Sequence, residues 1–138
     1  MNARRPGAGG LVVVIPVSPG GLIDRLAVLE LRLDRPLTTP ERAFLAEELA
    51  ALQAARDASL PADAELDALS DDLAEVVADQ RALVEDLVRA EARGDFGPAF
   101  VALARASLRL ADRRAALRRA IDLHLGARFP EPPPRPPY

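Results

Sequence analysis

The residue of this sequence that most needs a chemical partner is Arg114, which lies in the apolar arc of a predicted helix. A guanidinium is costly in such a place unless a carboxylate or another acceptor pairs with it. We interpret Arg114 as part of a structural polar layer with Gln80 and Ser107, and Glu30 is its preferred carboxylate partner. The alternative is a cleft between the first and fourth predicted helices that binds a nucleotide or sugar phosphate. The candidate binding residues of that cleft are Asp24, Glu30, Arg105, Asp112 and Arg114.

The acidic residues of the third predicted helix resemble a metal-binding carboxylate set, but their spacing indicates otherwise. Asp72, Glu75, Asp79 and Asp86 fall opposite the leucine seam at about 100° per residue, so we expect them on a solvated face. No second paired carboxylate motif follows, and the chain contains no cysteine. We therefore predict no metal site and no cofactor. His124, the single histidine, is interpreted as structural or solvated.

The elements that must position these residues are mostly helical. Leucine spacing, N-cap residues and prolines predict four helices. Their expected ranges are 19–35 after the N-cap Ser18, about 39–59 with Thr39 as N-cap, 63–93 closed by Gly94, and 98–126. Residues 11–17 are apolar and mostly β-branched, which predicts a short N-terminal strand with Pro16 suited to an edge. The expected architecture is an all-α bundle over 11–126, with a flexible arm at 1–10 and an extended Pro-rich tail at 127–138.

The third and fourth predicted helices both carry apolar residues at alternating spacings of three and four. A short turn joins them, so we expect a long antiparallel coiled-coil hairpin. Folding it about Asp95 predicts four facing pairs: Leu87 with Ser107, Leu83 with Leu110, Gln80 with Arg114, and Leu73 with Ile121. The Arg-Gly-Asp and Asp-Phe-Gly triplets in the turn at 93–97 are interpreted as helix-capping residues rather than as binding motifs.

Composition limits the classes of partner. The chain has 138 residues and a net charge of −3, and all 18 of its basic residues are arginine. A protein that binds phosphate backbones needs a basic surplus, so nucleic acid is an unlikely partner. No segment approaches the roughly 18 apolar residues of a membrane span, and we expect a cytoplasmic protein.

Two blocks of the sequence resemble a group of short bacterial helical proteins of unknown function. The first runs from Ile15 through Leu22-Ile-Asp-Arg-Leu to Glu30, and is similar to I-x-V-S-x-G-E-L-I-D-K-L-x-I-L-E-I-K. The second begins at Arg93-Gly-Asp-Phe-Gly and is similar to R-G-D-F-G-x-x-F-I-x-L-A-R-S-x-Y-x-x-N-D-x-R-x-x-L-K-x-x-I. Gly21, Leu108, Ala111 and Ala82 depart from the pattern, where it has Glu, Tyr, Asn and usually Trp. The matching polar residues are consistent with a structural ion-pair network.

These observations favour a non-catalytic interaction or assembly module. The predicted strand and the second apolar side of the first helix both lack obvious partners within the chain, so we expect a homodimer. The strand, or the Pro-rich tail with its P-x-x-P-x-R arrangement ending at Arg135, could also contact another protein. The alternative function is an enzyme or binder that acts on the anionic small molecule described above.

Overall fold

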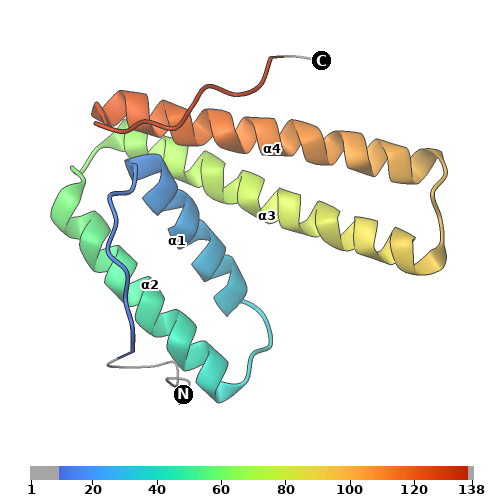
Figure 1. Cartoon of the computed structure of the whole chain (residues 1–138), viewed down its shortest axis with the longest axis horizontal. Coiled ribbons are helices and arrows are strands. Elements are labelled where there is room, and N and C mark those ends of the chain that lie inside the picture. The colour runs from blue at the N-terminus through green and yellow to red at the C-terminus, as the bar shows by residue number, and fades with distance from the viewer. Residues whose placement is uncertain (1–9, 137–138) are drawn as a thin grey trace.

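The computed structural model describes residues 10–136, and they form four helices (Figure 1). These are α1 (Pro19–Leu33), α2 (Thr39–Ser59), α3 (Ala64–Arg93) and α4 (Pro98–Leu125). The α3 and α4 helices run antiparallel as a long hairpin, while α1 and α2 lie against one half of it and leave the turn end projecting (Figure 1). The expected all-α class is confirmed. None of the helices in the described part combines the length and apolarity that a bilayer crossing demands.

Local sequence signals explain where the helices begin and end. The Ser18 hydroxyl accepts a hydrogen bond from the Gly21 amide at 3.0 Å and so caps α1, as predicted. The N-cap of α2 is Thr38, one residue before the predicted Thr39, because Thr38 and Glu41 form a reciprocal capping box. Gly94 and Gly126 end α3 and α4 with φ of +66°, the left-handed conformation that glycine adopts without strain.

The core is organised around α1, which packs against all three other helices. Leu29, Leu73 and Ile121 are fully buried, and Leu73 and Ile121 share one apolar cluster as their predicted pairing requires. The expectation that the second apolar side of α1 lacks a partner is wrong, because Val28 and Leu31 pack against the apolar cluster and lie beside α3. The remaining buried members of the cluster are Leu22, Ile23, Leu26, Ala27, Leu66, Val76, Val77 and Leu117.

The predicted N-terminal strand is not present. Residues 11–18 form neither helix nor strand, and residues 10–136 contain no strand at all. A strand needs a neighbouring backbone to complete its hydrogen-bond ladder, and the helical bundle offers none. Pro16 also lacks an N–H with which to join a ladder. The predicted arm at 1–10 lies almost wholly outside the described residues.

Candidate functional site

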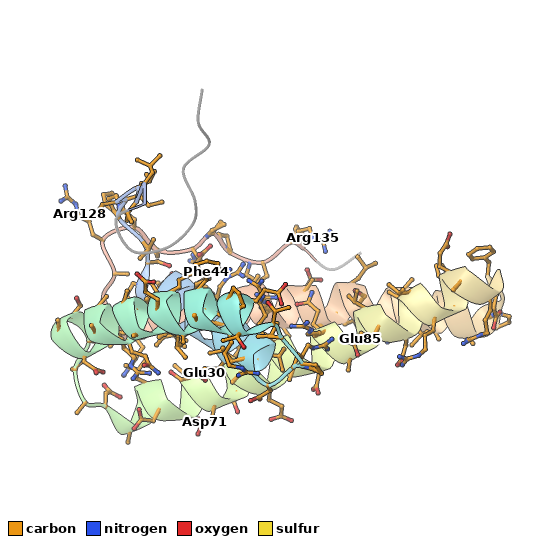
Figure 2. All side chains as sticks on the ribbon, turned by 90° about the horizontal axis from the view of Figure 1, so that it is seen from below. Glu30, Phe44, Asp71, Glu85, Arg128 and Arg135 are labelled. Carbon is orange, nitrogen blue, oxygen red and sulfur yellow. The ribbon has the colours of Figure 1, made fainter. Side chains whose placement is uncertain are left out.

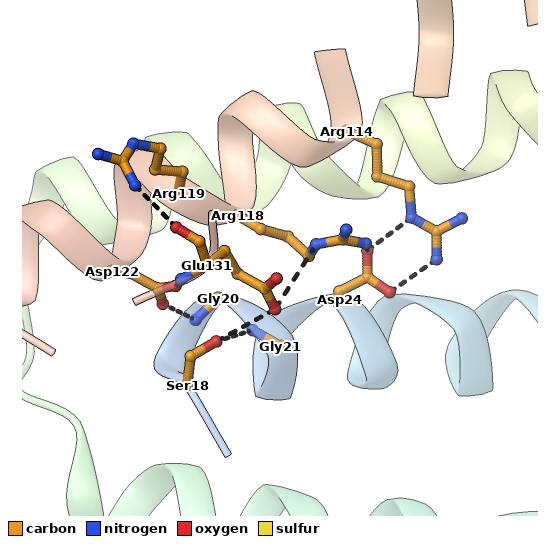
Figure 3. Close-up of polar contacts among 9 residues, drawn as sticks. All are labelled: Ser18, Gly20, Gly21, Asp24, Arg114, Arg118, Arg119, Asp122 and Glu131. Atoms are coloured by element: carbon orange, nitrogen blue, oxygen red, sulfur yellow. Dashed lines mark hydrogen bonds and ion pairs between the residues drawn. The ribbon is translucent and has the colours of Figure 1, made fainter. Parts of the chain in front are cut away.

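The polar residues of the hairpin meet α1 in a compact network (Figure 3). Asp24 of α1 accepts two hydrogen bonds from Arg114 of α4, from Nε to Oδ2 and from Nη2 to Oδ1, each at 2.6 Å. Nη1 of Arg114 donates to Gln80 Oε1 of α3 at 2.9 Å. The Asp24 carboxylate raises the pKa of Arg114 above its ordinary value, chiefly through these hydrogen bonds. One arginine therefore ties together three helices.

The Asp24–Arg114 pair is largely shielded from water. The side chains are 11% and 24% exposed, and Arg118 adds a weaker contact from Nη1 to Asp24 Oδ2 at 3.4 Å. A bidentate carboxylate satisfies a guanidinium in the way that an anionic ligand would. Asp24 thus takes the place beside Arg114 that the cleft hypothesis assigned to a ligand.

Glu30, the preferred partner of Arg114 in the sequence analysis, does not reach it, and that prediction is wrong. Glu30 is exposed and lies on the side of the molecule that also carries Asp71 (Figure 2). Because Asp24 and Glu30 are six residues apart, they point about 120° apart around α1. Only one of them can face α4, and that residue is Asp24.

The other candidates on α4 are also separated from the ion pair. Arg105 is exposed, and it lies half a turn around the helix from Arg114. Asp112 accepts from Nη2 of Arg135 in the tail at 3.1 Å, on that same outer side. Ser107 shares the face of Arg114 and is half-buried, two turns nearer the hairpin turn. Of the five candidate binding residues, the structure brings only Asp24 and Arg114 together.

The most deeply buried polar side chain, Asp122, was missed in the sequence analysis. Asp122 is fully buried and accepts two backbone hydrogen bonds, from the Gly20 and Glu131 amides, each at 2.7 Å. A Cβ added at Gly20 would lie 2.3 Å from the Arg118 carbonyl oxygen, so α1 begins in direct contact with the α4 backbone. Arg114, Arg118 and Asp122 are spaced four apart, and this row was the available signal.

The tail closes the network. Arg119 Nη1 donates to the Glu131 carbonyl at 2.8 Å, and Ser18 Oγ donates to Glu131 Oε1 at 3.4 Å. The buried Nε of Arg118 makes no hydrogen bond and lies 3.9 Å from the same carboxylate oxygen. First-turn amides of a helix attract anions, and here Asp122 and Ser18 already accept from them. The start of α1 is therefore an internally occupied anion site.

A second polar cluster joins the ends of α3 and α4. His124 Nε2 lies 2.8 Å from Asp63 Oδ2, and Nδ1 lies 3.2 Å from Glu65 Oε2. Asp63 also caps α3 by accepting from the Leu66 amide. That hydrogen bond, and then the one with His124, lower the pKa of the Asp63 carboxyl. The arrangement explains His124 as a structural residue that fastens the two helix ends.

The surface has a hollow that the sequence analysis did not anticipate, which we name the α1–α3 groove. It has a volume of about 770 Å³ and lies between α1, the end of α2 and the start of α3. Its apolar residues are Ile23, Leu26, Ala27, Leu60, Pro61, Ala62, Leu66 and Ala74. Its charged residues are Glu30, Arg56, Asp57, Asp67 and Asp71. Among residues 10–136, no three potential ligands are grouped to hold a metal ion.

The residues ahead of α1 are the most exposed apolar row in the structure. Leu11, Val12, Val13, Val14, Ile15 and Val17 are between 60% and 90% exposed. At Gly21, where the resembled pattern has glutamate, an added Cβ would lie 3.6 Å from Glu131 Oε1, so a tail carboxylate stands beside that position.

No family model, no curated protein and no solved structure matches the chain.

Proposed function

We propose that this protein is a non-catalytic helical assembly module that forms a homodimer through residues 11–17. The observation that carries the proposal is the exposure of six aliphatic side chains in a seven-residue stretch. Monomeric proteins expose single apolar side chains routinely, but a contiguous row indicates an interaction surface. The segment follows directly on the Ser18 cap, so a partner bound there would be held close to the rigid α1–α4 contact.

Burial of this segment supplies enough free energy for association. Complete burial of one aliphatic side chain contributes about 1.5–3 kcal/mol, so six contribute roughly 9–18 kcal/mol before any cost. Association costs about 4–15 kcal/mol in lost motion and interface ordering. Two equivalent segments contribute in a symmetric dimer, because each copy buries its own row against the other copy. The two rows of a symmetric dimer would therefore contribute roughly 18–36 kcal/mol, which exceeds the cost of association.

The alternative function, binding of a nucleotide or sugar phosphate between α1 and α4, has no supporting observation. Asp24 already pairs with Arg114, and Asp122 already accepts from the Gly20 amide at the start of α1. A ligand would have to displace a carboxylate whose residue is 8% exposed or less. We therefore do not propose it.

The proposal is tested by changing the apolar row without touching the bundle. We expect the variant Val12→Ser/Val14→Ser/Ile15→Ser to sediment as a monomer at micromolar concentration, where the unmodified chain sediments as a dimer. Helix content by circular dichroism should stay the same, because these residues belong to no helix. The matched control is Val84→Ser/Val88→Ser, which removes exposed valines from α3. Equal effects of the two variants, or a monomeric unmodified chain, would contradict the proposal.

A further inference from the structure

The α1–α3 groove has the form of a docking site for an extended apolar segment. Its floor includes Ile23, Leu26 and Leu66, which are 3–6% exposed, and its rim is open to solvent at Ala62 and Ala74. The volume of about 770 Å³ leaves room for several side chains above that floor. An apolar floor with a polar rim is the usual composition of a protein interface.

The charge of the rim selects the kind of segment that would fit. Glu30, Asp57, Asp67 and Asp71 surround the floor, and Arg56 is the single basic member of the lining. Arg56 already pairs with Asp57 at 3.3 Å, so the rim keeps a surplus of negative charge. An apolar peptide that carries positive charge at one end would complement this surface.

The chain itself contains such a segment. The apolar row 11–17 is preceded in sequence by Arg4 and Arg5, and no acidic residue occurs before Asp24. The row and the groove are therefore complementary both in apolar character and in charge. This match favours a copy of the row over an unrelated peptide as the occupant of the groove.

The groove and the row of one molecule do not meet. In Figure 2, Glu30 and Asp71 lie on the lower side of the molecule, while the N-terminal segment leaves α1 on the upper side. The six aliphatic side chains of the row remain 60–90% exposed in the single chain. A second molecule can present its row to the groove without rearranging the bundle.

We propose that residues 11–17 of one copy bind in the α1–α3 groove of a second copy. The inference rests on the proposed function, because it names the surface on which that dimer forms. Residues 11–17 belong to no helix or strand, so we infer that each segment extends from its own bundle to the partner's groove and that exchange of both segments closes the dimer.

Disulfide trapping tests the contact, because the chain contains no cysteine of its own. Val13→Cys is placed in the row of one preparation and Ala74→Cys in the groove of another, and the two are mixed and oxidised. We expect this mixture to form a cross-linked heterodimer at least about tenfold faster than a mixture with Ala92→Cys. Ala92 is an exposed control about 27 Å further along α3. Equal trapping at Ala74 and Ala92 would overturn the inference.

Charge exchange supplies a second, independent readout. We expect Asp67→Arg/Asp71→Arg, or Arg4→Asp/Arg5→Asp, to raise the dimer dissociation constant about tenfold. Combining the two sets should restore it to within about threefold. The control Asp72→Arg/Asp79→Arg makes the same charge change on α3 outside the groove and should have little effect. No restoration in the combined variant would count against the contact.

The outcomes separate the inference from the proposed function. A dimer that is disrupted by Val12→Ser/Val14→Ser/Ile15→Ser but gives no trapping at Ala74 overturns the groove and leaves the assembly function standing. A monomer at every concentration overturns both. If Val13→Cys/Ala74→Cys in one chain forms only an intrachain disulfide, the row occupies its own groove and the exchange is wrong.

Discussion

Single carboxylates hold the elements of this protein together at the residue scale. Asp24 joins α1 to Arg114 of α4, and Asp122 joins the start of α1 to the tail. Both accept hydrogen bonds from groups that would otherwise be buried without a partner, and leaving such groups unsatisfied is expensive. The charged side chains that first suggested a ligand site are therefore paired with other groups of the same chain.

Arg114→Met tests the Asp24–Arg114 pair. We expect the free energy of unfolding to fall by about 2–3 kcal/mol, because the change leaves Asp24 with only the longer contact from Arg118. The double variant Asp24→Asn/Arg114→Met should lose less than the sum of the single losses, by at least about 1 kcal/mol. Urea denaturation measures the unmodified chain, the single variants Arg114→Met and Asp24→Asn, and the double variant. Arg113→Met, an exposed neighbour, is the control, and additive single losses would contradict a coupled pair.

Asp122→Asn keeps the shape of the side chain and replaces one acceptor oxygen with an amide donor. Either the Gly20 or the Glu131 amide would then face a donor, so we expect a loss of about 2–3 kcal/mol in unfolding free energy. Thermal and urea unfolding measure it, with the exposed Asp79→Asn as the control. A variant as stable as the unmodified protein would show that the two hydrogen bonds do not matter.

The loss of unfolding free energy at acidic pH should depend on Asp63. Its folded pKa is lowered below 3.8 by the Leu66 amide and by His124, so its stabilising effect is complete above that value. The effect is lost as the pH falls through the lower folded pKa. Asp63→Asn still caps the helix but does not titrate, so the stability difference from the unmodified protein should stay constant from neutral pH down to about 4 and shrink below it. A stability difference independent of pH in urea titrations would contradict this assignment.

Arg114 shows how far the sequence alone predicts contacts between residues. The sequence indicated that Arg114 is paired, and it gave Gln80 as a neighbour from the hairpin register. It did not identify the carboxylate, because the choice between Asp24 and Glu30 depends on the rotation of α1 against α4. That rotation is fixed by the close approach of Gly20 to the α4 backbone, which only tertiary structure reveals.

Helices were predictable at the element scale because their signals are local. Caps, prolines and leucine spacing lie within a few residues of the ends that they define. The N-terminal strand failed for the opposite reason, since a strand exists only with a neighbouring backbone. The β-branched residues at 11–17 favour an extended backbone. The sequence of this segment does not show which other segment would lie beside it.

Gly20→Ala tests the crossing of α1 and α4. Alanine normally favours a helix over glycine by up to about 1 kcal/mol. Here its Cβ would lie 2.3 Å from the Arg118 carbonyl oxygen, so we expect a net loss of about 1–3 kcal/mol. Gly21→Ala is the matched control in the same turn, since its nearest contact is a side-chain oxygen at 3.2 Å and the loss should be below about 1 kcal/mol. Thermal unfolding compares the stabilities of the two variants. Equal stability would contradict a direct contact between Gly20 and the α4 backbone.

The whole molecule combines a packed half with surfaces that the single chain leaves open. The predicted all-α bundle and its hairpin are present, while the groove between α1, α2 and α3 came only from the structure. The groove could not be predicted because it depends on the angle at which α2 and α3 diverge from α1. The exposed row at 11–17 was visible as an apolar run, but the sequence assigned it to a strand.

The sedimentation of the unmodified chain across a micromolar concentration range tests the assembly proposal most directly. We predict a reversible equilibrium that reaches twice the mass of one chain, and that weakens in high salt because charges contribute at the groove rim. The row 11–17 must lose its exposure in that dimer. A chain that keeps the mass of one copy throughout the range would contradict the proposed function.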